Sequence, residues 1–533
     1  MKPNPRGVTA ATTRPSANWF SAIFCAAFLS IISASAAVSQ TDTEGMNPAE
    51  KWVVAQATAG EIADLTEKFP QENDRKLGAH FLENLLTREL PHRHGVRING
   101  AIIDEAIDLS NAQIPFQVSL DQCRFNKNVA FAHANFMGGL SFDGSRFKKA
   151  DFIHMKVRGD AAFADATFEG RAEFFAADIA GDFSVARSKF QNKQRAASFI
   201  GMKVGGSAYF TAAVFKGPLF FLFADIANDL YMQSAGFQNT AGVSFWGMKV
   251  GRDAHFDSTV FDGWMDFRRT DIIGNLSALK TRFQNKQQPA TFHSTKIGGD
   301  AVFGGARFEG PPDLRYADFG LLDLSNASWP KVAPQIQMQG MSYKHIRAVA
   351  ENEPKSHRAL LELADQSPYT ADVYTNLEAF FLRQGYRADA DRAFIAGKLR
   401  EREQYSPEGR GVREYVLSSD WLRWLGSTML YLLVGFGRRP WQAAIPCAGL
   451  VAIGCILFSP KKMEPQKPED TPRVYSRFWY SLGLFLPFVD LQADKVWKPK
   501  TDQIFLRNYM RVHILLGWIL VPLVLAALTG LIK

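Results

Sequence analysis

The chain has 533 residues, of which 47% are hydrophobic, and a formal net charge of +8 at pH 7. This length suggests several structural units rather than one. Basic and acidic residues are equal in number over 1–329, whereas residues 330–533 contain 27 basic and 19 acidic residues. The neutral first part lacks the basic stripe that nucleic-acid binding needs, so we expect no nucleic-acid partner.

The N-terminus has the pattern of an export signal. Basic residues precede an apolar run from Trp19 to Ile32, and small residues follow it. We predict a signal peptide over residues 1–36 with cleavage after Ala36, the alternative being an uncleaved membrane anchor. Residues 37–95 have apolar residues at helical spacing and are predicted to form a helical cap over the unit that follows.

A ladder of large apolar residues, mostly Phe, dominates the central part of the chain, and its spacing alternates between five and six. A small residue lies two positions before most rungs, as in the pairs Ala161–Phe163, Ala166–Phe168 and Ala208–Phe210. This period fits neither a helix nor an alternating strand. Four faces of five, six, five and six residues make a coil of 22. Coils stacked at about 4.8 Å would bury the rungs along one axis.

A longer repeat supports this coil length. Similar segments begin 47, 46 and 47 residues apart, at Phe152, Phe199, Phe245 and Phe292. Two coils of 22 plus a short insertion give this period, and polar insertions are present at 191–194, 238–240 and 284–287. The stretch from Ile98 to Trp329 has room for about ten coils stacked in this way.

On these residues the stretch resembles the pentapeptide-repeat family, whose repeat is a small residue, a polar residue and a central Leu or Phe. The resemblance implies a right-handed quadrilateral β-helix over residues 96–330, although six-residue steps interrupt the strict fives. We therefore predict an all-β solenoid with an α-helical connector and two transmembrane helices. Family members have unrelated roles, so the fold alone assigns no activity. Rods of this family often dimerise end to end, and the predicted cap leaves homo-oligomerisation open.

Residues 331–425 change to a helical period. Tyr374, Leu377 and Phe381, with the spaced alanines after Gly385, resemble the helical hairpin of a tetratricopeptide unit. One such unit is too short to form a binding groove, because these repeats need stacked neighbours. We predict a helical connector here, with peptide binding as the alternative.

Residues 426–533 are predicted to form a membrane module, with transmembrane helices near 441–459 and 512–532. The segment between them has more basic than acidic residues, which favours a cytoplasmic location. We therefore expect a bacterial inner-membrane protein that contacts the lipid bilayer and has its β-helix on the periplasmic side.

The same segment suggests an alternative. With a spanning helix on each side, it resembles a degraded two-helix ion-channel domain, in which Tyr480 and Ser481 would begin the pore helix and Asp490 would follow the filter. The Gly-Tyr-Gly filter of such channels is missing. An amphipathic hairpin at the membrane surface is the favoured interpretation.

Catalytic motifs are absent from the sequence. It contains no phosphate-binding Gly-Lys-Ser/Thr loop, no Cys-x-x-Cys and no His-Glu-x-x-His. Asp160, Asp253 and Asp300 recur just before predicted corners, where turn-forming hydrogen bonds explain them better than acid–base chemistry. We predict that the chain is not an enzyme, and we assign no catalytic, cofactor-binding or metal-binding residues.

One surface of the predicted rod suggests a partner site. Coil equivalence places large apolar residues outward on neighbouring coils, namely Phe220, Leu222 and Trp246, and places Phe223 and Trp264 at neighbouring corners. Such clusters mark contact sites, although a helix of the same chain or the membrane could also cover this one. The sequence thus predicts a membrane-tethered extracytoplasmic scaffold for an envelope protein. The alternative is a channel- or transporter-like module with the β-helix as sensor or stator.

Overall fold

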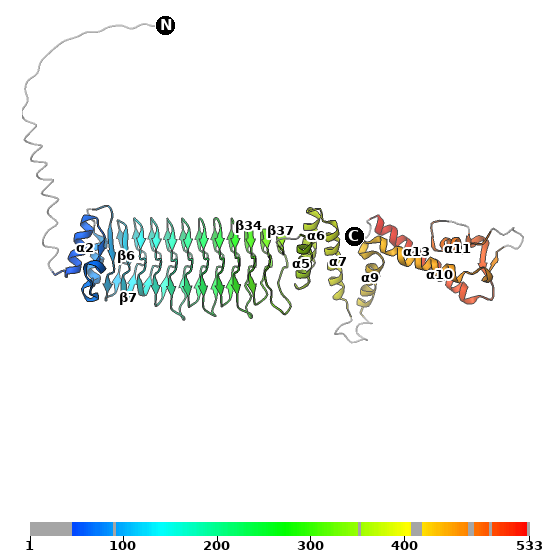
Figure 1. Cartoon of the computed structure of the whole chain (residues 1–533), viewed down its shortest axis with the longest axis horizontal. Coiled ribbons are helices and arrows are strands. Elements are labelled where there is room, and N and C mark those ends of the chain that lie inside the picture. The colour runs from blue at the N-terminus through cyan, green and yellow to red at the C-terminus, as the bar shows by residue number, and fades with distance from the viewer. Residues whose placement is uncertain are drawn as a thin grey trace, which may run out of the picture.

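The computed structural model describes residues 45–88, 92–349, 353–406, 418–466, 474–489 and 493–529. A β-solenoid of about 11 turns forms its centre, with helices at both ends (Figure 1). At about 4.8 Å per turn the solenoid is roughly 50 Å long. The predicted signal peptide lies outside the described residues.

Short helices cover the N-terminal end of the solenoid. They are α2 (Pro48–Ala59), α3 (Leu65–Lys68), η2 (Glu72–Arg75) and α4 (Ala79–Thr87). Helix α2 begins with a capping box, in which Asn47 and Glu50 each accept the other's backbone N–H at 2.9 Å. Strand β1 (Ala63–Asp64) pairs with the first coil, so its edge is covered rather than open.

Four parallel ladders form the sides of the solenoid, and we number these faces in chain order. The first face consists of β2 (Val96–Asn99), β6 (Val118–Asp121), β9 (Leu140–Ser141), β12 (Ala161–Ala162), β16 (Phe183–Ser184), β20 (Ala208–Tyr209), β24 (Leu230–Tyr231), β28 (Ala254–His255) and β32 (Leu276–Ser277). The second face consists of β3 (Ile102–Ile103), β13 (Thr167–Phe168), β17 (Lys189–Phe190), β21 (Val214–Phe215), β25 (Gly236–Phe237), β29 (Val260–Phe261), β33 (Arg282–Phe283) and β35 (Arg307–Phe308).

The third face consists of β4 (Ile107–Asp108), β14 (Ala172–Glu173), β18 (Ala197–Ser198), β22 (Leu219–Phe220), β26 (Val243–Ser244) and β30 (Met265–Asp266). The fourth consists of β5 (Gln113–Ile114), β8 (Asn135–Phe136), β11 (Lys156–Val157), β15 (Asp178–Ile179), β19 (Lys203–Val204), β23 (Asp225–Ile226), β27 (Lys249–Val250) and β31 (Asp271–Ile272). Longer strands bend around a corner and join two faces: β7 (Arg124–Ala130), β10 (Arg146–Asp151), β34 (Lys296–Val302), β36 (Asp318–Asp323) and β37 (Ser342–Arg347).

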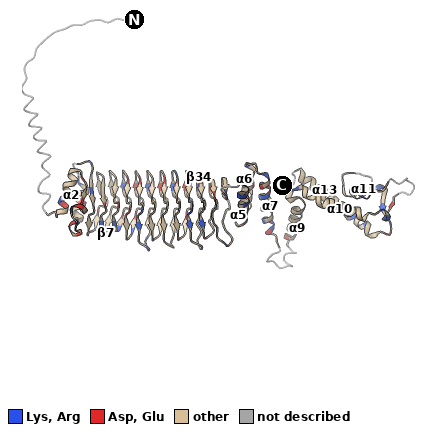
Figure 2. Cartoon of the chain, viewed as in Figure 1, with Lys and Arg blue, Asp and Glu red and all other residues tan. Residues whose placement is uncertain are grey.

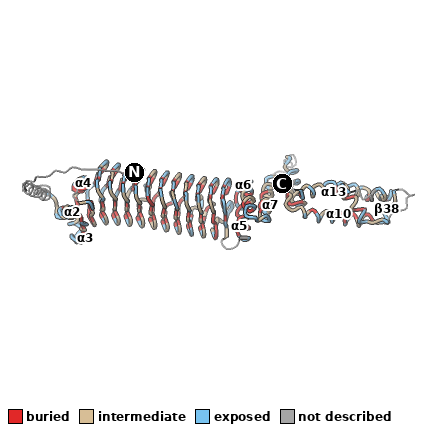
Figure 3. The backbone as a smooth tube through the Cα atoms, turned by 90° about the horizontal axis from the view of Figure 1, so that it is seen from above, coloured by how far each residue is buried: buried red, intermediate tan, exposed pale blue. Residues whose placement is uncertain are grey.

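This arrangement confirms the predicted solenoid with a helical connector and two apolar helices after it. The last strand of the solenoid, β37, lies beyond the boundary expected at residue 330. Buried residues recur in every coil along the rod (Figure 3).

Aromatic rings stack in register inside the solenoid. On the second face, neighbouring rings lie nearly parallel from Phe125 to Trp329; Phe147 and Phe168, for example, have centroids 5.1 Å apart and planes 7° apart. A second column includes Phe152, Phe174 and Phe199, with centroid separations of 4.8 and 5.0 Å. These separations match the spacing of parallel strands, so each ring covers the ring of the next coil.

Small residues fill the space beside the rings. Where Ser or Thr replaces Ala, the side chain is buried and its hydroxyl donates to a carbonyl of the preceding coil. Thr281 Oγ1 donates to the carbonyl of Phe256 at 2.7 Å, and Ser145 Oγ donates to that of Leu120 at 2.7 Å. A buried hydroxyl is therefore tolerated here because it has a partner.

The three polar insertions lie at one corner, between the second and third faces. Each folds around an Asn: Asn192 Oδ1 accepts the N–H groups of Gln194 and Arg195 at 3.0 Å, and Asn285 forms the equivalent turn. The coil register is restored after each insertion, which explains the long repeat in the sequence.

Helices also cover the C-terminal end of the solenoid. They are α5 (Glu353–Asp365), α6 (Ala371–Arg383) and α7 (Arg387–Glu403). Asn376 Nδ2 donates to the carbonyl of Met341 at 2.9 Å, and the Phe380 ring lies 5.9 Å from that of Tyr343. Helices α6 and α7 form the predicted hairpin, with Tyr374, Leu377 and Phe381 buried.

The C-terminal part contains α9 (Asp420–Val434), η3 (Gly435–Gly437), η4 (Pro440–Ala443), α10 (Ala444–Leu457), η5 (Pro460–Lys462), α11 (Arg477–Phe485), α12 (Ala493–Val496) and α13 (Ile504–Leu528), with a small antiparallel pair of β38 (Met463–Pro465) and β39 (Trp497–Pro499). Two helices, Pro440–Leu457 and Ile504–Leu528, are long and apolar enough to cross a membrane. The second begins before residue 512, where the sequence predicted its start.

Helix α11 packs between α10 and α13. Glycines allow this close approach: a Cβ on Gly454 would lie 2.1 Å from Ser481 Oγ, and one on Gly517 would lie 2.0 Å from the carbonyl oxygen of Phe485. Ser481 Oγ donates to the carbonyl of Val451 at 2.9 Å, and His513 Nε2 lies 3.0 Å from the carbonyl oxygen of Ser481. These bonds give partners to polar groups that are fully buried between apolar helices.

The column of stacked rings predicts that substituting two adjacent residues lowers the stability by very different amounts. Phe174 is fully buried between Phe152 and Phe199, whereas Phe175 is 38% exposed. We expect Phe174→Ala to lower local stability by about 3–5 kcal/mol and Phe175→Ala by less than about 1 kcal/mol. Hydrogen exchange of the β14 amides in the full-length protein measures both. Equal effects of the two substitutions would contradict the stacked core.

Candidate functional site

The third face presents the predicted partner-site residues. The register places Phe220 opposite Ser198 on one neighbouring coil and Ser244 on the other, so its ring is outward and partly exposed. The next residue, Phe221, points inward and is buried. The alternation from Phe220 at the end of β22 to Phe221 just after it therefore places one Phe on the surface and the other in the core.

Phe223 and Trp246 meet at the corner that follows the third face. Their ring centroids are 5.0 Å apart, and the Phe223 side chain is 57% exposed. The Phe223 N–H donates to the Trp246 carbonyl at 3.0 Å, which ties the two coils together. Gly247 leaves room for the Phe223 ring, because a Cβ at this position would lie 2.8 Å from Cδ1 of Phe223.

Trp264 lies apart from this pair, at the opposite edge of the third face. It immediately precedes Met265, which pairs with Val243, so it faces Gly242 on the neighbouring coil. A Cβ on Gly242 would lie 2.4 Å from Cδ2 of Trp264, so the indole packs where only a glycine fits. The structure thus brings Phe223 and Trp246 into contact and leaves Trp264 across the face from them.

The apolar surface extends further along the corner than the sequence suggested. Backbone N–H to carbonyl bonds join equivalent corner residues coil by coil, and His154, Ala176 and Gly201 donate to the carbonyls of Phe175, Ile200 and Leu222. We define the apolar corner as Ile153, Phe175, Ile200, Leu222, Phe223 and Trp246. Coil equivalence identifies the three added residues, because each directly follows an inward-pointing Phe. At the next coil the corner residue is Arg268, paired with Asp266 at 2.8 Å, so the apolar corner ends there.

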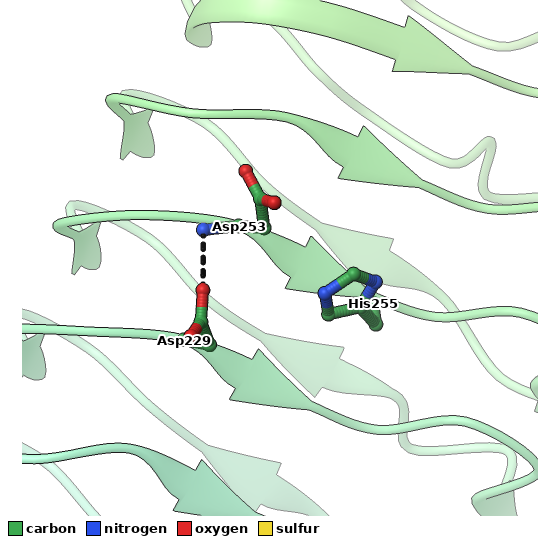
Figure 4. Close-up of side chains that lie close together, drawn as sticks. All are labelled: Asp229, Asp253 and His255. Carbon is green, nitrogen blue, oxygen red and sulfur yellow. Dashed lines mark hydrogen bonds between the residues drawn. The ribbon is translucent and has the colours of Figure 1, made fainter.

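A second cluster lies on the corner between the fourth and first faces. Ligand atoms of Asp229, Asp253 and His255 lie within 4.8 Å of one another (Figure 4). Asp229 Oδ1 accepts the N–H of Asp253 at 3.0 Å, and Asp253 Oδ1 accepts the N–H of Asn275 at 2.7 Å. Since the same bond recurs at Asp160, this column holds successive coils together, and we assign no metal to it.

The neighbouring rings continue this column on the first face. Tyr209, Tyr231 and His255 stack with centroids 5.0 Å apart and planes within 7°. Burial together with the nearby Asp229 carboxylate raises the pKa of Tyr231 above its ordinary value. A turn-forming role was predicted for Asp160 and Asp253, but their hydrogen bonds run between coils rather than within one turn.

No family model, curated protein or solved structure matches the chain.

The backbone at Phe223 generates a prediction about stability. Its φ of 55° is in the left-handed region, which costs most residues about 1–2 kcal/mol relative to glycine. Because the Phe223 side chain is exposed, we expect the free energy of unfolding of the Phe223→Gly protein to differ from that of the wild type by less than about 1 kcal/mol. We expect Phe223→Val to be less stable than Phe223→Gly by about 1–2 kcal/mol, since a β-branched residue tolerates this conformation poorly. Urea unfolding of the full chain measures this order, and the reverse order would contradict the corner geometry.

Proposed function

We propose that this protein is a non-enzymatic scaffold: a pentapeptide-repeat-type rod, tethered to the bacterial inner membrane, that binds an envelope protein on the periplasmic side. The apolar corner is the observation that carries this proposal. It combines large apolar side chains from successive coils on an otherwise mixed-charge rod (Figure 2). Phe175 and Phe223 are exposed, and the other four residues are partly exposed. Apolar groups gathered in this way favour contact with another macromolecule.

The surface of the C-terminal helices supports the membrane tether. Apolar side chains on α10 and α13 face away from the helix contacts and are exposed, including Ile445, Ile456, Leu515, Trp518 and Ile519. Water would solvate such a surface poorly, whereas lipid chains match it. A pair of helices with this surface supports insertion into a bilayer.

The junction between connector and membrane helices supports a scaffold that holds its rod in place. The Arg438 guanidinium, just after η3, pairs with Glu378 of α6 and lies 3.3 Å from Asp391 of α7. It also lies 4.5 Å from the centroid of the Phe394 ring. An arginine held by two carboxylates and a ring restricts movement of the connector relative to the membrane helices.

The covered ends of the rod favour binding at its sides. At the N-terminal end, β1 pairs with the first coil and the short helices cover it. At the C-terminal end, α5 and α6 contact β37. Strand pairing with another chain needs a free edge, so these caps disfavour growth of the β-helix from either end. The side faces are the surfaces that remain.

The packing of α11 bears on the channel alternative. Tyr480 and Ser481, which would begin a pore helix, are buried against α10 and α13. The amphipathic hairpin at the membrane surface stays a prediction, and the position of the segment between two apolar helices keeps the channel-like module as the second candidate. Asp490, the other residue of that hypothesis, lies outside the described residues.

Site-specific photo-crosslinking tests the scaffold proposal. A photoreactive amino acid in place of Phe223 should capture one envelope protein in living cells, whereas the same group in place of Tyr209, on the first face, should not. Because Trp246 packs against Phe223, we expect Trp246→Ala to reduce the crosslink by about tenfold, the effect of losing one well-packed contact residue. Equal capture at both positions, or capture that is insensitive to Trp246→Ala, would contradict a specific partner site.

A further inference from the structure

A cleft of about 450 Å³ lies between α7 and α9, where the connector meets the first helix of the C-terminal part. Its apolar wall is formed by Phe394, Leu430 and Phe436. This volume is in the range of small-molecule sites, which are about 300–1,000 Å³. The cleft is therefore large enough for the polar end of an amphiphile and the first part of its apolar chain.

Two arginines face the cleft without a carboxylate partner. Among the described residues, no carboxylate oxygen lies within 4.0 Å of the side-chain nitrogens of Arg402 or Arg423. Arg402 instead lies 5.9 Å from the centroid of the Tyr431 ring and 3.4 Å from Thr428 Oγ1, and Arg423 lies 5.6 Å from the centroid of the Tyr405 ring.

Three other basic residues of α7 are neutralised within the helix. Lys398 pairs with Glu401 at 2.9 Å, Arg400 pairs with Glu403 at 2.9 Å, and Arg392 pairs with Asp389 at 2.7 Å. The cleft therefore holds a local excess of two positive charges beside an apolar wall. That combination is complementary to an anion attached to an apolar chain.

The position of the cleft indicates where such a ligand would come from. Helix α9 carries Trp421, Trp424 and Tyr431, and Trp441 lies at the start of the first apolar helix. Trp and Tyr are enriched at membrane–water interfaces. Arginine side chains bind phosphate groups through charge-assisted hydrogen bonds. We propose that this cleft binds an anionic phospholipid, with the phosphate at Arg402 and Arg423 and the glycerol and first acyl carbons against Phe394 and Leu430. The proposal rests on the membrane tether but not on the scaffold partner.

Gly426 offers a way to close the cleft without disturbing the fold. It lines the cleft, and no heavy atom lies within 4 Å of a Cβ built on it. Leu at this position would occupy the ligand space and would suit the helix better than Gly. Gly449 on α10 is equally open and lies away from the cleft lining, so Gly449→Leu is a matched control.

The experiment uses the full-length protein in neutral detergent micelles doped with either phosphatidylglycerol or phosphatidylcholine, with retained lipid measured by native mass spectrometry. We expect wild type to retain phosphatidylglycerol in preference to phosphatidylcholine. We expect Arg402→Gln, Arg423→Gln and Gly426→Leu each to reduce retention about tenfold, the loss of one hydrogen bond to a charged group or of the space itself. Gly449→Leu and Arg392→Gln should retain lipid like the wild type.

Three results would overturn the proposal. They are the absence of any lipid preference, equal retention in the Gly426→Leu and Gly449→Leu proteins, and full displacement of lipid by millimolar glycerol phosphate, which would show that the apolar wall plays no part. Sedimentation of each variant with membranes after carbonate extraction tests the tether separately. A protein that stays in the membrane without lipid preference refutes this cleft alone, and one that leaves the membrane refutes the tether.

Discussion

Parallel stacking of inward aromatic rings is the interaction on which the rest of the structure depends. Each ring lies on the ring of the next coil at a separation set by backbone pairing, as Phe261 lies 5.4 Å from Phe283 with planes 2° apart. The backbone ladder and the ring column therefore have the same repeat, and neither can shift register without breaking the other. This constraint decides which residues point outward, and so it also decides what surface the rod can present.

Corners are where the constraint becomes visible on the surface. The residue after each inward Phe of the third face must lie at the turn, and the one after it takes a left-handed conformation, as in Phe223. Side chains at these positions cannot enter the core, so Phe175, Leu222 and Trp246 remain at the surface whatever their hydrophobicity. An apolar corner in such a fold is thus a feature of the surface and not of the folding core, which is why we associate it with binding.

Much of the fold could be predicted because a solenoid repeats one local rule. The five- and six-residue steps predicted the coil, and the long repeat predicted the short insertions near Asn192, Asn239 and Asn285. Contacts between side chains and backbone of neighbouring coils could not be predicted from the sequence. That Asp253 accepts an N–H from the next coil, or that Trp264 faces Gly242, depends on pairing between coils, which a single repeat does not encode.

In the C-terminal part, too, the sequence predicts the helices but not how they pack. Hydrophobic length predicted two helices that could span a membrane, and such helices are present. The insertion of α11 between them depends on Gly454 and Gly517 meeting Ser481 and Phe485. Glycines at these places have no period that distinguishes them from other glycines. The cleft beside α9 likewise forms between two helices that are separate in the chain. Arg402 of α7 and Arg423 of α9 line one cleft only because the two helices pack together, which the sequence does not predict.

Membrane topology tests the central claim most directly, because the proposed scaffold requires the rod to lie outside the cytoplasm. Paired periplasmic and cytoplasmic reporters would be fused after Gln335, just before the last solenoid strand, and after Pro468, between the two apolar helices. The account predicts that the Gln335 fusions report the periplasm and the Pro468 fusions the cytoplasm. A cytoplasmic report from Gln335 would contradict the exported scaffold and would make the channel-like arrangement the leading hypothesis.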